Sequence, residues 1–108
     1  MTTQRPTIHD LREPVETPGD GIVSRTIHVD DDIRVVLFSF AAGQQLSDHT
    51  AAVPATLEIV EGEAEIAIGD EQVEGHQGTW VHLPTGMPHG IVARTPVTML
   101  LMLLKHGG

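Results

Sequence analysis

Histidines are the residues of this chain best suited to chemistry, and there are seven of them among 108 residues. An imidazole can ligate a transition metal or exchange a proton near neutral pH. The sequence contains no cysteine, which excludes disulfides, thiolate metal sites and a cysteine nucleophile. The position of each histidine relative to the predicted strands and turns decides which of them could act together.

The framework that must position these histidines is predicted to be a series of short β-strands. Runs rich in β-branched and aromatic residues alternate with Gly, Pro and Asp turns, and no segment of helical length has an apolar period of three to four. The tripeptide Glu61-Gly62-Glu63 is a hairpin signal. The predicted strands are Ile22–Val29, Ile33–Ala41, Thr56–Val60, Ala64–Ile68, a strand around Val73, Trp80–Leu83, Gly90–Ala93 and Val97–Leu104. Many short strands with such turns favour an all-β sandwich or barrel.

The chain is short enough to be a single domain with one core. Residues 1–21 contain three prolines and two glycines with little periodicity, so we expect an irregular N-terminal arm laid over the barrel. Residues 22–108 make up the predicted barrel domain. Within it, residues 44–54 are mostly polar or small and are not assigned to a strand.

Two segments resemble the sequence motifs of the cupin superfamily. The first begins Gly43-Gln-Gln-Leu-Ser-Asp-His49, is followed by Gly62, and matches the first cupin motif in part. The second, Gly78-Thr-Trp-Val-His-Leu-Pro-Thr-Gly-Met-Pro-His89, matches the glycine, proline, glycine and histidine of the second motif. The resemblance covers about residues 35–104. It implies a small RmlC-like cupin of the conserved-barrel type, an antiparallel double-stranded β-helix or jelly roll, with His49 and His89 facing its pocket.

The resemblance also implies where a metal would bind, and half of that site is missing. Metal-binding cupins use two histidines separated by one residue, a glutamate, and the histidine of the second motif. Carried over to this chain, these positions are His49, Ala51, Ala55 and His89. Alanine cannot ligate a metal, and two histidines are fewer than the three protein ligands of a usual catalytic zinc or iron site. The last position of the second motif, often asparagine, is Ala93.

Two further side chains are candidates to complete the site. His82 lies seven residues before the second-motif histidine, and strand alternation groups it with Trp80 without telling which face is inward. Gln45 lies in the first motif segment. Glu58 is three residues from Ala55, an odd offset that sends it to the opposite face of a strand. Zinc, nickel and iron all accept imidazole ligands, and the sequence does not choose among them.

Two functions follow as hypotheses. The first is a metal-dependent enzyme of oxygenase or isomerase type, in which His49 and His89 hold a divalent transition metal. The second is a metal-free module that binds a small carboxylate or phenolic ligand through hydrogen bonds to the same histidines, in space that the two alanines open. The predicted pocket residues are Ala51, Ala55, Leu57, Ile59, Ile66, Leu83 and Met87.

Charge and hydropathy narrow the choice of partners. The formal net charge of -9 repels phosphate backbones and the basic residues form no cluster, so we expect no nucleic acid partner. Residues 1–20 have no apolar run typical of a signal peptide or membrane anchor, so we expect no membrane partner and take the cytoplasm as the default location. Residues 97–104 are apolar at successive positions, so the outer face of this strand needs cover and indicates a homodimer, as the resemblance also implies.

Overall fold

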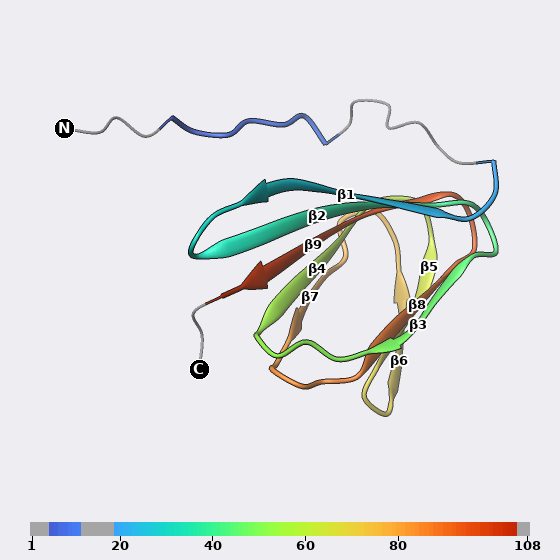
Figure 1. Ribbon diagram of the computed structural model, residues 1–108. Coiled ribbons are helices and arrows are strands. Elements are labelled where there is room, and N and C mark those ends of the chain that lie inside the picture. Colours follow the sequence, from blue (N-terminus) through green and yellow to red (C-terminus); the bar gives the residue numbers. More distant parts are fainter. Residues whose placement is uncertain (1–4, 12–18, 106–108) are drawn as a thin grey trace.

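The computed structural model describes residues 5–11 and 19–105, and in these residues the chain forms nine β-strands and no helix (Figure 1). The strands are β1 (Ile22–Val29), β2 (Ile33–Phe40), β3 (Gln45–His49), β4 (Ala55–Glu61), β5 (Ala64–Ile68), β6 (Glu71–Gly75), β7 (Trp80–Leu83), β8 (His89–Ala93) and β9 (Val97–Leu104). The all-β prediction is confirmed. Of the predicted arm, only residues 5–11 and 19–21 are described, and residues 106–108 of the predicted barrel domain lie outside the described residues.

The strands form two antiparallel sheets whose inner faces enclose one interior. The five-stranded sheet has the order β1-β2-β9-β4-β7, and the four-stranded sheet has the order β3-β8-β5-β6. Strands that are far apart in the sequence become neighbours, since β2 pairs with β9 and β3 pairs with β8. This antiparallel crossing between two sheets is the jelly-roll arrangement that the sequence predicts. In the part of the chain that the structure describes, no helix is long and apolar enough to cross a membrane.

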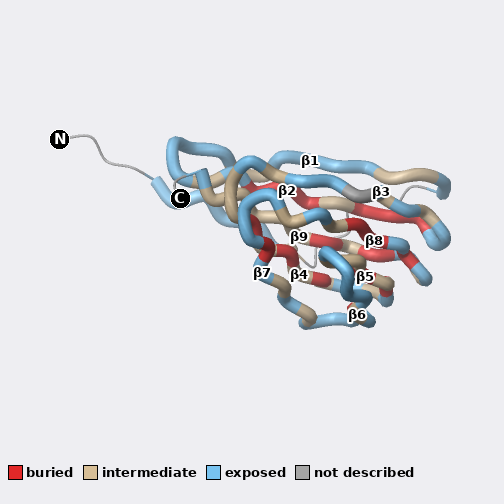
Figure 2. The backbone as a smooth tube through the Cα atoms, turned by 90° about the horizontal axis from the view of Figure 1, so that it is seen from below, coloured by how far each residue is buried: buried red, intermediate tan, exposed pale blue. Residues whose placement is uncertain are grey.

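Large apolar side chains fill one end of the interior, which we call the packed end. Strand β4 shows the alternation that builds it, because Leu57 and Ile59 are 2% and 0% exposed whereas Glu58 between them is half-buried on the outer face. Figure 2 shows the buried segments along the middle strands and the exposed ones at β1 and the loops. The buried core cluster is Phe40, Ala55, Leu57, Ile59, Ala64, Ile66, Leu83, Ile91, Ala93, Val97 and Met99.

Two glycines allow the packed end to close tightly. A Cβ atom on Gly75 would lie 2.8 Å from Cδ1 of Ile66, so only glycine leaves room for that side chain. Gly62, in the turn that leads from β4 in one sheet to β5 in the other, has a φ of 97°, and a Cβ atom there would collide with the carbonyl of Pro96. Residues with a Cβ atom rarely adopt such a φ. The predicted turn at this tripeptide is present, but the hairpin interpretation is wrong, because β4 pairs with β7 and β9 in one sheet while β5 pairs with β6 and β8 in the other. The glycine of this turn is required by both conformation and space.

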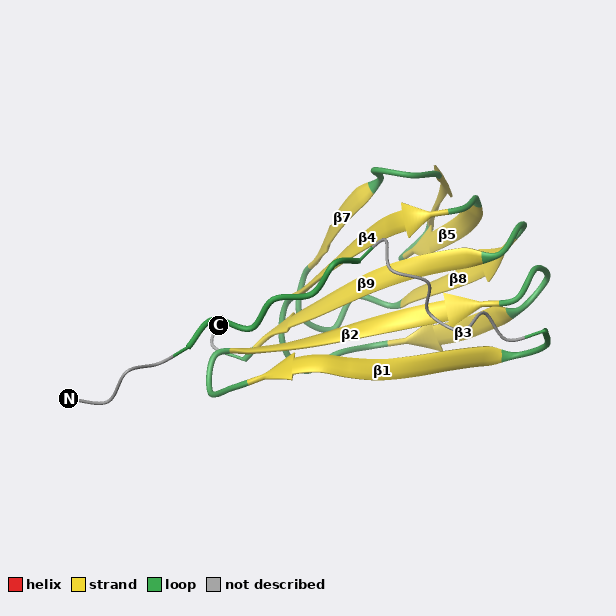
Figure 3. Ribbon diagram, turned by 90° about the horizontal axis from the view of Figure 1, so that it is seen from above, coloured by secondary structure: helices red, strands yellow, loops and turns green. Residues whose placement is uncertain are grey.

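The described part of the N-terminal arm, residues 5–11, lies over the outer face of the five-stranded sheet (Figure 3). Nε2 of His9 lies 2.9 Å from the carbonyl oxygen of Ile27 and donates to it. Ile27 is the extra residue of a β-bulge, because the register with β2 shifts between Thr26 and His28. The arm thus adds a hydrogen-bond donor at the carbonyl of the bulge residue.

The carboxylate of Asp30 holds the turn between β1 and β2. Its Oδ1 accepts hydrogen bonds from the backbone N–H groups of Asp32 and Ile33 at 2.7 and 2.9 Å, and its Oδ2 lies 2.8 Å from Nε2 of His28. These hydrogen bonds lower the pKa of Asp30 to about 2, and the one from His28 contributes most. Lys105 fastens the end of β9 to the same turn, through Nζ to the Asp30 carbonyl and through its backbone N–H to the Asp32 carbonyl.

Two strands differ from the predicted series. β3 (Gln45–His49) lies within residues 44–54, where the sequence pattern assigns no strand. It has one apolar side chain, Leu46, and a bulge interrupts its alternation, so it carries no period of two that could be recognised. β6 extends over five residues around Val73. It is an edge strand next to β5, and an edge strand tolerates polar residues. Because most of its residues are polar, its full length does not show as an apolar pattern in the sequence.

Candidate functional site

A cavity of about 440 Å³ lies between the two sheets at the end opposite the packed end, which we call the open end. Strands β2 and β9 form one wall, β3 and β8 form the other, and the segment 50–54 forms the rim. The lining residues are Phe38, Leu46, His49, Thr50, Ala51, Ala52, Val53, Ala55, His89, Leu101 and Leu103. Three of them are polar and none carries a permanent charge, so the cavity is an apolar space with a small polar side.

The polar side of the cavity is formed by His49 and His89, which face each other across β3 and β8. The two residues are paired in the register of these strands, and directly opposed residues lie on the same face of a sheet. Their ring centres are 6.3 Å apart, and the ring planes are inclined by 42°. His49 is exposed and His89 is half-buried, so the pair extends from the solvent into the cavity.

A β-bulge gives His49 its direction. Leu46 pairs with Ile91 and His49 pairs with His89, so three steps along β3 match two steps along β8. The bulge supplies one extra residue in β3. In an unbroken strand, an odd offset would place Leu46 and His49 on opposite faces. The extra residue brings both side chains to the same cavity.

A hydrogen bond fixes the proton on the ring of His89. Its Nδ1 lies 3.1 Å from the carbonyl oxygen of Met87. Because a carbonyl oxygen only accepts hydrogen bonds, Nδ1 carries the proton of the neutral ring and Nε2 keeps a lone pair. Nε2 is therefore the nitrogen of His89 that can accept a hydrogen bond from a ligand or ligate a metal.

Backbone hydrogen bonds hold the rim of the cavity in place. The N–H of Gly86 donates to the carbonyl of Ala51 at 2.9 Å, and the N–H of Leu104 donates to the carbonyl of Pro54 at 2.9 Å. Ala51 and Ala55 line the same cavity as the two histidines. The two positions at which the family resemblance expects a histidine and a glutamate thus converge on the cavity but carry only methyl groups.

The side chains at the cavity do not fit an ion that the protein holds by itself. Among the described residues, no group of three or more His, Cys, Asp or Glu side chains is placed to hold a metal. Catalytic zinc sites normally have three protein ligands, and His49 and His89 supply two. Two ring nitrogens about 2.0–2.1 Å from one tetrahedral ion would bring the ring centres to roughly 5 Å apart, closer than the observed 6.3 Å.

The two side chains predicted as additional ligands lie away from this pair. His82 is opposite Thr56 and is exposed together with Trp80, on the outer face of the five-stranded sheet. Gln45 is exposed next to the inward-facing Leu46 and lines a groove on the outer face of the four-stranded sheet. The structure brings neither side chain to the two histidines.

The predicted pocket residues divide into two groups. Ala51 and Ala55 line the cavity with the histidine pair. The four larger residues belong instead to the buried core, where successive inward positions of β4, β5 and β7 pack against each other; they are Leu57, Ile59, Ile66 and Leu83. Met87 is half-buried, and its sulfur lies next to Gly69 rather than among the residues that line the cavity.

Several lining residues are not indicated by the sequence motifs. These are Phe38, Leu46, Thr50, Ala52, Val53, Leu101 and Leu103. Alternation along Val97–Leu104 groups Leu101 with Leu103. This alternation would have predicted both residues as cavity lining if the sequence also showed which face of the strand points inward. No signal in the sequence marks Thr50 or Val53, because the rim is an irregular segment whose position depends on the hydrogen bonds to Gly86 and Leu104.

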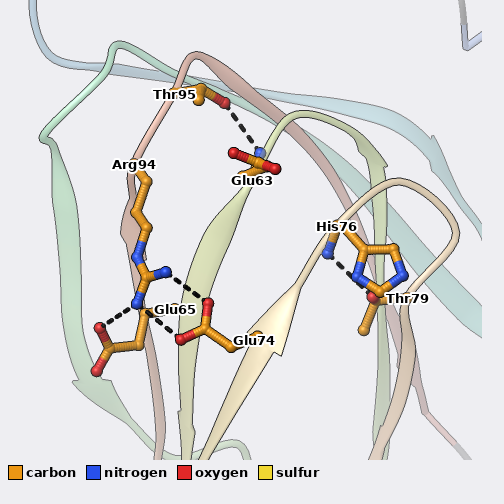
Figure 4. A network of polar contacts seen from close by, with 7 residues as sticks. All are labelled: Glu63, Glu65, Glu74, His76, Thr79, Arg94 and Thr95. Carbon is orange, nitrogen blue, oxygen red and sulfur yellow. Dashed lines mark hydrogen bonds and ion pairs between the residues drawn. The ribbon is translucent and has the colours of Figure 1, made fainter.

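A second polar cluster lies on the outer face of the four-stranded sheet (Figure 4). The guanidinium of Arg94 donates to both carboxylate oxygens of Glu74 at 2.6 and 2.7 Å, and to Glu65 at 3.1 Å. The hydrogen bonds to Glu65 and to Glu74 raise the pKa of Arg94. The three side chains pair with each other at the surface and join β5, β6 and the end of β8, so we assign them a structural role.

The model of the cupin domain family matches residues 36–104 of the chain. No curated protein matches it. Among solved structures, a conserved protein of unknown function from Streptococcus pyogenes is 29% identical with a TM-score of 0.82, and the match covers 98% of this chain and 93% of that one. An RmlC-like cupin protein from Desulfovibrio desulfuricans is 27% identical with a TM-score of 0.85, covering 94% and 98% of the two chains.

A salicylate 1,2-dioxygenase from Pseudaminobacter salicylatoxidans is a more distant match. It is 14% identical with a TM-score of 0.72, and the match covers 77% of this chain and 26% of that one. At this identity the similarity concerns the fold alone. The three structures agree with the jelly-roll architecture described above, and they leave the ligand of the cavity to be inferred from its own residues.

Proposed function

The chain belongs to the cupin domain family, and we propose that it binds a small, largely apolar molecule between its two sheets, with His49 and His89 as the main polar contacts. The observation that carries this proposal is the cavity of about 440 Å³ in which two imidazoles face each other among aliphatic side chains. Binding sites for small molecules typically combine an apolar lining with a few placed polar groups.

Each part of the lining has a distinct role in this proposal. His49 is exposed at the mouth, and His89 is half-buried with Nε2 available to a ligand. Leu101 and Leu103 from the opposite sheet supply apolar surface. Burying apolar surface stabilises a complex by roughly 25 cal/mol per Å² before the costs of association. Ala51 and Ala55 leave the space that larger side chains would occupy.

The test is a binding screen by proton–nitrogen correlation spectroscopy in the presence of EDTA. The probes are para-cresol, cyclohexanol, para-toluate and cyclohexanecarboxylate. We expect at least one probe to shift the backbone signals of residues 49–53, 55 and 89, and we expect Ala51→Leu, which fills the cavity, to abolish the shift. Ala67→Leu is the matched control, because Ala67 lines the groove on the outer face of the four-stranded sheet. If no probe shifts these signals, or if Ala51→Leu changes nothing, the proposal is wrong.

The second candidate is a metal-dependent activity of oxygenase or isomerase type. The observation that favours it is the opposed pair of imidazoles at the cavity, since nitrogen ligands suit zinc, nickel and iron. With two protein ligands, the remaining positions would fall to water or substrate. Elemental analysis of protein purified without a polyhistidine tag tests it. About one metal ion per chain, lost in both His49→Ala and His89→Ala, would support this candidate, and metal far below that ratio would rule it out.

The outer face of the five-stranded sheet supports a homodimer as part of the proposed function. Trp80 is 60% exposed there, opposite Glu58, which in turn pairs with the half-buried Leu100 of β9. An exposed aromatic side chain on a sheet face is typical of an interface between subunits. We expect sedimentation equilibrium to give a dimer for the native chain and a weaker one for Trp80→Ser. A monomer at all concentrations would contradict the dimer and leave the cavity proposal intact.

A further inference from the structure

We propose that the molecule bound in the cavity is neutral and carries a hydroxyl group on an apolar body, such as a simple phenol or an alicyclic alcohol, and is not a carboxylate. This inference rests on the proposed function, that the cavity binds a small molecule. It adds the chemical class of the ligand, which follows from three features of the open end: the hydrogen-bonding pattern of the two histidines, the distance between their rings, and the absence of a cation in the lining.

The first feature is the direction of the hydrogen bonds. With its proton on Nδ1 and committed to the carbonyl of Met87, the neutral His89 presents only the lone pair of Nε2. A ligand that meets this nitrogen must donate a hydrogen bond. A hydroxyl group can do so, whereas a carboxylate has only lone pairs and would face another lone pair.

The second feature is the 6.3 Å between the ring centres. An oxygen atom about 2.8 Å from one nitrogen of each ring lies roughly 4 Å from each ring centre, so this separation places the two nitrogens at an angle of roughly 105° around the oxygen. That angle is close to the tetrahedral geometry of a hydroxyl oxygen. The ligand hydroxyl donates its hydrogen bond to Nε2 of His89. Its oxygen can accept a hydrogen bond from His49, because either neutral tautomer of His49 has one N–H group.

The third feature is the charge of the lining. Among the described residues that line the cavity there is no lysine or arginine, and the remaining polar group is the hydroxyl of Thr50. The chain as a whole has a formal net charge of -9. A carboxylate entering this cavity would leave water without gaining a permanent cation as partner, which is costly. A neutral hydroxyl avoids this cost, and its apolar body matches Leu101, Leu103 and Phe38.

The test compares ligands that have the same apolar body and differ in the polar group. Isothermal titration calorimetry of the full chain near neutral pH, with EDTA present, measures para-cresol against para-toluate and cyclohexanol against cyclohexanecarboxylate. We expect each hydroxyl compound to bind at least about tenfold more tightly than the matching carboxylate. This ratio corresponds to the loss of one hydrogen bond and the burial of an uncompensated charge.

Two variants locate the contact. His89→Leu keeps a side chain of similar bulk and removes Nε2, and we expect it to weaken binding of para-cresol about five- to tenfold. His82→Leu is the matched control, because His82 is exposed on the outer face of the other sheet, and we expect no change. Backbone correlation spectra of both variants establish that they are folded, and histidine-ring nitrogen spectra of the native chain test the Nδ1–H form of His89 even if a variant does not fold.

The outcomes separate this inference from the proposed function. If the carboxylates bind as tightly as the hydroxyl compounds or more tightly, the hydroxyl inference is overturned and the binding proposal stands. If neither member of either pair binds, both are overturned. If para-cresol binds equally well to His89→Leu and to the native chain, or if His89 carries its proton on Nε2, the assigned contact is wrong.

Discussion

The packed end and the open end of the barrel are built from the same strands with different side chains. Along β4, the inward position at the packed end is Ile59, which is fully buried among other aliphatic side chains, and the inward position at the open end is Ala55. At the packed end even Gly75 is in contact with Ile66, while the open end keeps a cavity of about 440 Å³. The difference shows that one end provides stability and the other provides space.

The largest expected effect comes from restoring the two missing ligands at the open end. In the double variant Ala51→His with Ala55→Glu, four metal-ligating side chains would converge on the cavity that the native residues leave apolar. Without metal, the buried glutamate is expected to lower the free energy of unfolding by about 3–5 kcal/mol. With zinc or nickel, the midpoint of thermal unfolding should rise steeply, since metal binding adds to folding free energy.

The control for this double variant is the native chain under the same metal concentrations, which should show a much smaller thermal shift. Calorimetric titration with zinc should give one site in the variant. A variant that folds but binds zinc no better than the native chain would contradict the placement of Ala51 and Ala55 around the histidine pair.

A substitution at the packed end should be nearly as costly. Ile59→Ala removes a fully buried side chain, and such changes cost about 2–5 kcal/mol in unfolding free energy because they leave a cavity. Urea unfolding followed by tryptophan fluorescence measures the loss. Ile8→Ala is the matched control, because Ile8 is 84% exposed in the arm and should change stability by less than about 0.5 kcal/mol. Equal effects of the two substitutions would show that the packed end is not the stabilising region.

Overfilling the packed end should have an intermediate effect. In Gly75→Ala the new methyl group would lie 2.8 Å from Cδ1 of Ile66 and 3.3 Å from Cγ1 of Ile59, so both side chains must move. Overpacking of this kind costs about 1–3 kcal/mol. Gly19→Ala, where nothing lies within 4 Å of the new atom, should not lower the unfolding free energy. A neutral Gly75→Ala variant in the same urea assay would mean that this end is packed less tightly than described.

The smallest expected effect concerns the exposed turn that fastens β9 at the open end. Because folding lowers the pKa of Asp30 to about 2, its carboxylate stabilises the fold above the ordinary value of 3.8, and this contribution is lost as the pH falls toward 2. The difference in unfolding free energy between the native chain and Asp30→Ala should therefore shrink over that pH range. Asp31→Ala is the control, and a difference that stays constant with pH would contradict the role of the Asp30 carboxylate.

The sequence predicts the packed end better than the open end. Seven of the nine strands appear as apolar or alternating runs, since burial on a sheet leaves a period that can be read without the fold. β3 does not, because the bulge before His49 breaks its period and Leu46 is its one apolar residue. β6 is mostly polar, and Val73 alone marks it in the sequence. The predicted all-β jelly roll is confirmed.

The candidate site depends on information that local patterns do not contain. The motif resemblance selects His49 and His89, and the structure places them opposite each other. Alternation could not tell that His82 faces outward, because a period of two defines two faces without saying which one is inside. The contributions of Leu103 and Val53 to the lining arise from strand pairing across the barrel and from the rim, which are tertiary features.

The central claim is that the open end binds a small hydroxylated molecule through His49 and His89 without requiring a metal. The most direct measurement is a histidine-ring proton–nitrogen spectrum of the native chain, recorded with EDTA during a titration with para-cresol. We predict that His89 carries its proton on Nδ1 and that the ring nitrogens of His49 and His89 shift together with the ligand, while those of His82 do not. Ring signals that stay unchanged until zinc is supplied would contradict the account.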